Sequence, residues 1–88
     1  MDKKHAVLLN ACIYGHTEVV RILLADPTIN PGHQDSLSLQ YACEYGHIEI
    51  VKLLLQSGKV NKAANNDGPF RVALVNKHIN IVKILTNA

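Results

Sequence analysis

Apolar and polar residues in this chain recur with the period of an α-helix. Leu39, Ala42 and Cys43 fall at i, i+3 and i+4, which predicts the buried face of a short helix. Gly46 ends this helix, because a residue just past a helix C-terminus often needs a positive φ. The apolar residues of a second helix follow, and they are Ile50, Val51, Leu53, Leu54 and Leu55. They leave only a narrow polar stripe, so we expect this helix pair to pack against neighbours on both sides.

The helix-pair pattern occurs three times at a spacing of 31 residues. When residues 6–30 are aligned with residues 37–61, eleven of 25 positions are identical. The same offset aligns the second copy with a third, whose matching residues are Ala73, His78, Ile79, Ile81, Val82, Lys83 and Leu85. Two consecutive offsets agree, which is typical of a repeat array. Each unit of such an array is stabilised mainly by its neighbours, which suits a chain of 88 residues.

We therefore predict an all-α fold in which antiparallel helix pairs stack into a single domain. The domain covers residues 1–88, and its units lie at approximately 4–34, 35–65 and 66–88. In the first unit, helices are expected at about residues 4–14 and 17–25. The connectors between units are short fingers rich in Pro, Gly, Asn and Asp, which favour turns.

The third unit departs from the other two. Pro69 suits the first turn of its first helix, where a missing N–H is tolerated. Lys77 replaces the glycine of the other units and would destabilise the fold by roughly 1 kcal/mol if its φ is positive, unless Asn76 adopts that conformation instead. We expect a terminal unit, with one face in water.

Composition and charge limit the classes of function. A net charge of +2, spread from Lys3 to Lys83 without a cluster, disfavours nucleic-acid binding. No apolar run approaches the length of a membrane span, and the N-terminus does not resemble a signal peptide. Two cysteines at core positions do not indicate a disulfide scaffold. We expect an intracellular, cytoplasmic monomer that does not bind membranes.

Cysteine and histidine side chains are candidates for a metal site or for thiol chemistry. Equivalent residues of stacked units, such as Cys12 and Cys43, should lie roughly 8–10 Å apart, too far for a disulfide. His16, His47 and His78 share that spacing and are too far apart to bind one zinc ion, so we expect them to hydrogen-bond locally. No nucleophile, paired carboxylates or phosphate-binding loop is evident. We predict no enzyme activity, metal or cofactor.

The repeated motif is similar to that of ankyrin repeats. Leu-x-x-Ala-Cys-x-Tyr-Gly-His-x-Glu-Val/Ile-Val-x-x-Leu-Leu occurs at Leu8–Leu24 and at Leu39–Leu55, and it resembles the family's Leu-His-x-Ala-Ala-x-x-Gly-His-x-x-Val-Val-x-Leu-Leu-Leu. The resemblance implies an ankyrin-repeat solenoid. The period is shorter than the family's usual one, and no unit keeps both the Thr and the His of the Thr-Pro-Leu-His opening. We therefore expect the side-chain hydrogen bond formed there to be absent, and the first and third units to be less rigid.

The resemblance also implies where a protein partner would bind. Members of the family use a concave strip along the first helices together with the finger tips. The strip corresponds to Ile13, Tyr14, Glu44, Tyr45, Val75 and Asn76, and the tips to His33, Gln34, Ser36, Ala64, Asn65 and Asp67. Tyrosine suits such a surface, because it gives a large contact area with little entropy loss. Alternatively, both tyrosines cover the helix ends of a neighbouring unit, and the fingers are polar only because turns are.

The predicted function is a non-catalytic protein–protein interaction module. The alternative is a structural role, as an engineered scaffold or a fragment of a longer array with no partner of its own. A third interpretation is a metal- or redox-responsive protein that uses Cys12 and Cys43. The resemblance does not identify a partner, because one fold hosts many unrelated functions.

Overall fold

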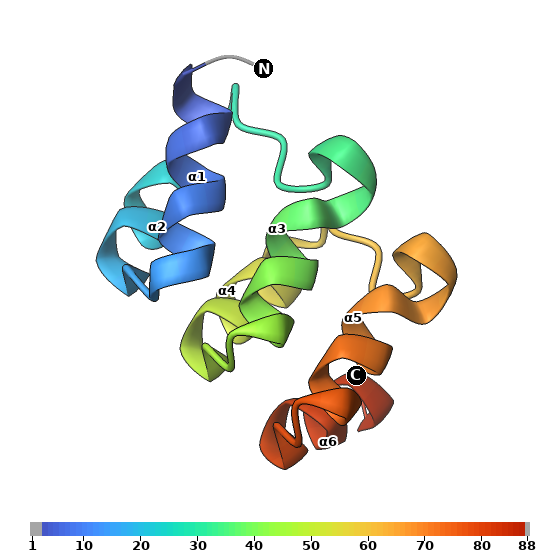
Figure 1. The fold of residues 1–88 in the computed structure, drawn as a ribbon. Coiled ribbons are helices and arrows are strands. Elements are labelled where there is room, and N and C mark those ends of the chain that lie inside the picture. Colours follow the sequence, from blue (N-terminus) through green and yellow to red (C-terminus); the bar gives the residue numbers. More distant parts are fainter. Residues whose placement is uncertain (1–2, 88) are drawn as a thin grey trace.

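The computed structural model describes residues 3–87, which form six α-helices and no β-strand (Figure 1). The helices are α1 (Lys3–Tyr14), α2 (Thr17–Leu24), α3 (His33–Glu44), α4 (Ile48–Ser57), α5 (Ala64–Val75) and α6 (Ile79–Asn87). Consecutive helices form three antiparallel pairs, as the repeat pattern predicts. The prediction of an all-α array is therefore confirmed.

The three pairs stack side by side, and each contacts its neighbours. The first helices, α1, α3 and α5, form one row, and the second helices, α2, α4 and α6, form another (Figure 1). The fingers that join the pairs lie along one side of the stack. None of the helices in the described part of the chain has the length and hydropathy of a membrane-spanning segment.

The core follows the 31-residue period of the sequence. Its buried residues include Leu8, Ala11, Cys12 and Val20 of the first pair, Leu39, Ala42, Cys43, Ile50, Val51 and Leu54 of the second, and Ala73, Ile81 and Leu85 of the third. The middle pair contributes most, because α4 contacts both α2 and α6. Burial of this apolar surface is the main stabilising term in folding.

A residue with positive φ lies in the turn between the two helices of each pair. These residues are Gly15 (φ 78°), Gly46 (φ 79°) and Lys77 (φ 61°). In the third pair, Asn76 has a φ of −88°, so the lysine itself adopts the left-handed conformation. A non-glycine residue is less stable in this region by about 1–2 kcal/mol.

Both α3 and α5 begin with a left-handed turn, which the apolar pattern does not predict. Residues 34–36 and 65–67 have φ values between 54° and 61°. The right-handed part of each helix starts after this turn. Pro69 therefore lies in the first right-handed turn of α5, where its missing N–H is tolerated.

Side chains one turn further along these helices stabilise the left-handed turns. Gln40 Nε2 donates a hydrogen bond to the Asp35 carbonyl at 3.1 Å. Arg71 donates from Nε and Nη2 to the carbonyls of Asn66 and Asn65, both at 2.9 Å. Gln40 and Arg71 occupy the position of the histidine in the family's opening motif. These bonds differ from the Thr–His hydrogen bond of that motif, because Leu37 and Gly68 stand at the threonine position and take no part in them.

Candidate protein-binding surface

The C-terminal ends of α1, α3 and α5 form the first candidate surface, which we call the first-helix strip and which comprises residues 13, 14, 44, 45, 75 and 76. Tyr14 is 70% exposed, Tyr45 is 49% exposed and Val75 is 77% exposed. Asn76 is also exposed, whereas Ile13 and Glu44 are half-buried. The structure thus places all six residues at equivalent sites in neighbouring pairs.

Histidines of the following pair hold the strip in place. His47 Nε2 lies 2.9 Å from the Ile13 carbonyl oxygen, and His78 Nε2 lies 3.0 Å from that of Glu44. The expectation of local hydrogen bonds is wrong for His47 and His78, because these bonds join one helix pair to the next. Each bond fixes the C-terminal end of a first helix relative to its neighbour.

The glycines that directly follow the strip residues in the first two pairs make room for these histidines. A Cβ atom on Gly15 would lie 2.7 Å from Cε1 of His47, and one on Gly46 would lie 2.7 Å from Cε1 of His78. Such distances are too short for ordinary carbon contacts. Glycine is therefore favoured here by its positive φ and required by the imidazole packed against it.

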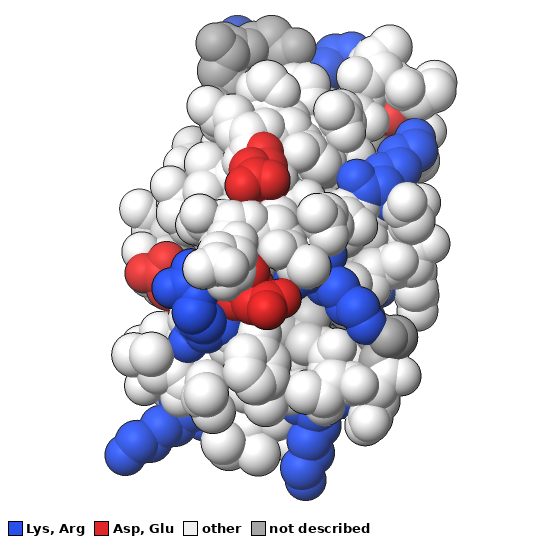
Figure 2. All heavy atoms as spheres, turned by 90° about the vertical axis from the view of Figure 1, so that its right-hand side faces the viewer, with Lys and Arg blue, Asp and Glu red and all other residues white. Residues whose placement is uncertain are grey.

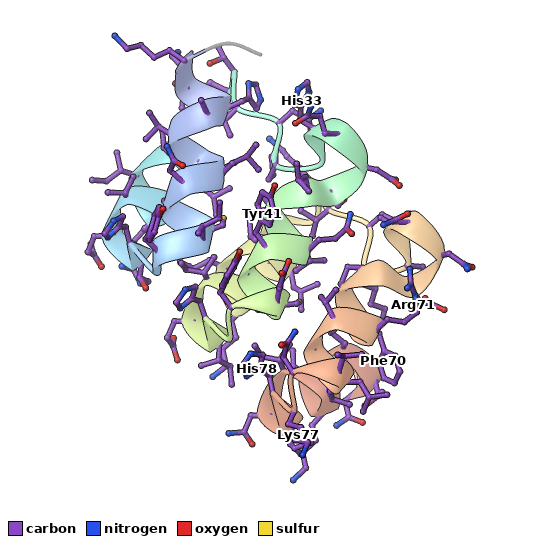
Figure 3. All side chains as sticks on the ribbon, in the orientation of Figure 1. His33, Tyr41, Phe70, Arg71, Lys77 and His78 are labelled. Atoms are coloured by element: carbon purple, nitrogen blue, oxygen red, sulfur yellow. The ribbon has the colours of Figure 1, made fainter. Side chains whose placement is uncertain are left out.

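Tyr41 is an additional aromatic residue beside the strip, and the sequence analysis did not include it. Its ring lies 6.4 Å from that of Tyr45, one helical turn away, and it is half-buried (Figure 3). The i, i+4 spacing of the two tyrosines on one helix was the signal that could have identified it. Together they form an aromatic pair at the centre of the row of first helices.

Two of the predicted finger-tip residues are not available to a partner. Ser36 is 2% exposed, and its Oγ accepts a hydrogen bond from the Asn61 N–H at 2.8 Å. Ala64 is also 2% exposed. Both were expected in an exposed turn, but Ser36 lies within the first left-handed turn and Ala64 directly precedes the second, and both side chains are buried. We therefore exclude Ser36 and Ala64 from the candidate surface.

The other predicted tip residues are accessible to different degrees. Gln34, Asn65 and Asp67 are exposed, and His33 is half-buried with its ring 4.7 Å from that of His5. Asn65 Nδ2 also donates a hydrogen bond to Gln40 Oε1 at 3.1 Å. Asn65 thus supports the finger as well as lining its surface.

Asp35 and Asn66 are exposed at the same tips but were not predicted. They lie within the two left-handed turns. The run of polar residues that follows each finger was the sequence signal that could have identified them.

Charged side chains of both signs are interspersed on the face shown in Figure 2, so no large patch of one sign covers it.

The cysteines do not support thiol chemistry. Cys12 and Cys43 are free and buried, and desolvation raises the pKa of each thiol to about 12. The thiolate is the reactive form, so neither cysteine is activated at neutral pH. Among residues 3–87, no group of three or more His, Cys, Asp or Glu side chains is arranged to hold a metal ion.

The chain is similar to a known protein family. Residues 8–88 match the family model described as ankyrin repeats in three copies. A search of curated proteins gave no match. The matched region begins within α1 and includes the rest of the three helix pairs, and its copy number agrees with the repeat found in the sequence.

Proposed function

Because the chain belongs to the ankyrin-repeat family, whose members are generally protein–protein interaction modules, we propose that it is a non-catalytic module that binds a protein partner. The contact surface is the first-helix strip, extended by Tyr41 and by the exposed finger-tip residues Gln34, Asn65 and Asp67. The mechanism is recognition by a preformed surface, without a reaction. The proposed state is a monomer in the cytoplasm, and the two free thiols support a reducing compartment.

The observation that carries this proposal is the exposure of Tyr14 and Tyr45 on a rigid support. Aromatic side chains of this size are common anchors of protein interfaces. The His47 and His78 hydrogen bonds fix the helix ends that present them. A surface fixed before binding loses little conformational entropy when a partner docks.

The proposal is tested by affinity capture from a native lysate. The wild-type chain is compared with the double variant Tyr14→Ala, Tyr45→Ala, after both have been shown to have the same melting temperature. We expect a protein that the wild type captures and the double variant does not. Isothermal titration with that purified protein should then give a Kd at least tenfold weaker for the double variant, which corresponds to roughly 1.4 kcal/mol or more.

Ile22→Ala is the matched control for the loss of exposed apolar surface. Ile22 is 70% exposed, as Tyr14 is, but it lies on α2 rather than on the first-helix strip. This variant should capture the partner as well as the wild type does. If the wild type captures nothing specific, or if Ile22→Ala is equally impaired, the strip is not the binding site and a scaffold role is favoured.

A further inference from the structure

The first helix pair presents, on its outer face, the residues that the later pairs bury against their predecessors. Val19 of α2 is 37% exposed, whereas its equivalents Ile50 and Ile81 are 0% and 2% exposed. Val7 is 42% exposed, whereas its equivalent Ser38 is 1% exposed. At these positions, the residues of the later pairs are buried, and the residues of the first pair are exposed.

His16 completes this outer face. Its equivalents His47 and His78 are half-buried and bond to a carbonyl of the preceding pair. His16 is exposed, and its ring lies 6.3 Å from the ring of Tyr14. The first pair thus contains the histidine that joins one unit to another, but here its imidazole is exposed.

The outer face of the third pair is different. Leu74 is 49% exposed, whereas its equivalents Cys12 and Cys43 are both 0% exposed beneath the following pair. Lys77 stands where the first two pairs have Gly15 and Gly46. Both replacements add side-chain volume at positions where the internal interfaces leave no space.

Lys77 is incompatible with the histidine of a following unit. A Cβ atom at the equivalent Gly46 would lie 2.7 Å from Cε1 and 2.9 Å from Nδ1 of His78. In Figure 3, His78 points towards the end of α3, whereas Lys77 points away from the stack on the outer side of the third pair. The lysine side chain therefore fills the volume that the next imidazole would need.

We infer that the outer face of α1 and α2 is a binding surface for a further helix pair of the same kind, and that the outer face of α5 and α6 is closed to one. The occupant is a helix pair whose first helix ends in a positive-φ glycine. Its carbonyl two residues before the glycine would accept a hydrogen bond from His16, as those of Ile13 and Glu44 do from His47 and His78.

This inference is independent of the first-helix strip and continues the interface already present between the three pairs. It also excludes a second copy of this chain as the occupant. The last pair of such a copy would bring Lys77 and Leu74 against His16 and Val7. Head-to-tail contacts between copies of a chain can produce open filaments. Because Lys77 and Leu74 block such a contact here, the chain should not polymerise head to tail.

The experiment adds one unit at either end of the full chain in the natural 31-residue register. In the first variant, a copy of residues 35–65 directly precedes residue 4. In the second, a copy of residues 58–88 follows residue 88. The third has the second extension together with Leu74→Cys and Lys77→Gly. Urea unfolding is followed by circular dichroism.

The N-terminal extension should raise the unfolding midpoint and keep a single transition, because each stacked unit adds an interface. The C-terminal extension should leave the midpoint unchanged, and the repaired version should raise it. Gly46→Lys within the added N-terminal copy is the matched control and should remove the gain. An equal gain at both ends, or none from the N-terminal unit, would overturn the inference.

A second measurement reports on the interface itself. Val19→Cys introduces an exposed thiol into a chain whose two natural cysteines are buried. Its labelling by a thiol reagent should be rapid in the chain without an extension and slower by on the order of tenfold in the N-terminally extended chain. Equal labelling rates in two folded chains would show that the added pair does not cover this face.

Discussion

The Nε2 atom of His47 lies 2.9 Å from the carbonyl oxygen of Ile13, so the start of the second helix in one pair is joined to the end of the first helix in the preceding pair. The same relationship holds between His78 and Glu44 at 3.0 Å. These bonds occupy helix carbonyls that have no intrahelical partner. Stability is therefore coupled between units through a repeated side chain.

Removal of this bond should destabilise the fold only where a preceding unit exists. His47→Ala should lower the free energy of unfolding by about 1–3 kcal/mol, because it removes the hydrogen bond and the packing on Gly15. His16→Ala should change it by less than about 0.5 kcal/mol, since His16 is exposed. Urea denaturation of both variants measures the difference. Equal losses would mean that the bond between units contributes nothing.

Alanine substitutions at Gly46 and Gly58 distinguish the cost of backbone strain from the cost of a steric clash. Gly46 and Gly58 have φ values of 79° and 69°, but a Cβ atom on Gly58 would have no neighbour within 4 Å. Gly58→Ala should therefore destabilise the fold by about 1 kcal/mol. Gly46→Ala should destabilise it by about 2–4 kcal/mol, because the new methyl group meets His78.

A double variant checks this assignment by thermal or urea denaturation. In the His78→Ala background, Gly46→Ala should lose no more stability than Gly58→Ala does in the wild type, since the imidazole is gone. Non-additivity of this kind is expected only for residues in contact. If the stability losses of Gly46→Ala and His78→Ala are additive, Gly46→Ala destabilises the fold through backbone strain alone.

The helices and their stacking could be predicted because the signal is local and repeated. Apolar spacing defined the buried face in each unit, and glycine marked the helix ends at Gly15, Gly46 and Gly58. The 31-residue offset then required each pair to bury its flanks against a neighbour. These features depend on residue type and spacing, which a sequence displays directly.

The finger tips could not be predicted in the same way. Their left-handed turns place three consecutive non-glycine residues at positive φ, against the preference of single residues. Contacts from Gln40 and Arg71 stabilise these turns, and Ser36 bonds to a residue 25 positions later. Because the conformation depends on specific side-chain contacts rather than on apolar spacing, the burial of Ser36 and Ala64 was not foreseen.

Core substitutions should show the same dependence on neighbours. Leu54→Ala should destabilise the fold by about 2–5 kcal/mol, because Leu54 is 0% exposed on a helix that packs between α2 and α6. Leu85→Ala should destabilise it by less, since α6 packs against α4 on one side only. Chemical denaturation gives both values, and similar losses would contradict the one-sided packing of α6.

Cysteine labelling should report unfolding rather than a surface reaction. Both thiols are buried and their pKa values are raised to about 12 by desolvation. At neutral pH, a chromogenic disulfide should react with neither cysteine in the folded chain, but with both in urea. The labelling rate should follow the unfolded fraction as urea increases. Rapid labelling of the folded chain would favour a redox role.

Acid should weaken the contact between the first finger and the N-terminal turn of α1. The Asp26 carboxylate accepts hydrogen bonds from the Thr28 hydroxyl at 2.7 Å, the Thr28 N–H at 2.9 Å and Lys4 Nζ at 3.0 Å. These bonds, led by that of the Thr28 hydroxyl, lower the pKa of Asp26 from 3.8 to about 2. Folding thus favours the charged form of this side chain.

The sign of the pH dependence follows from that shift. The carboxylate contributes its full stabilisation above pH 3.8, the ordinary pKa, and loses it as the pH falls towards 2. Asp26→Asn keeps the shape of the side chain but cannot titrate. The difference in unfolding free energy between wild type and variant should therefore be constant above about pH 5 and shrink between pH 4 and pH 2. A difference that stays constant down to pH 2 would mean that the charge of Asp26 does not support the finger.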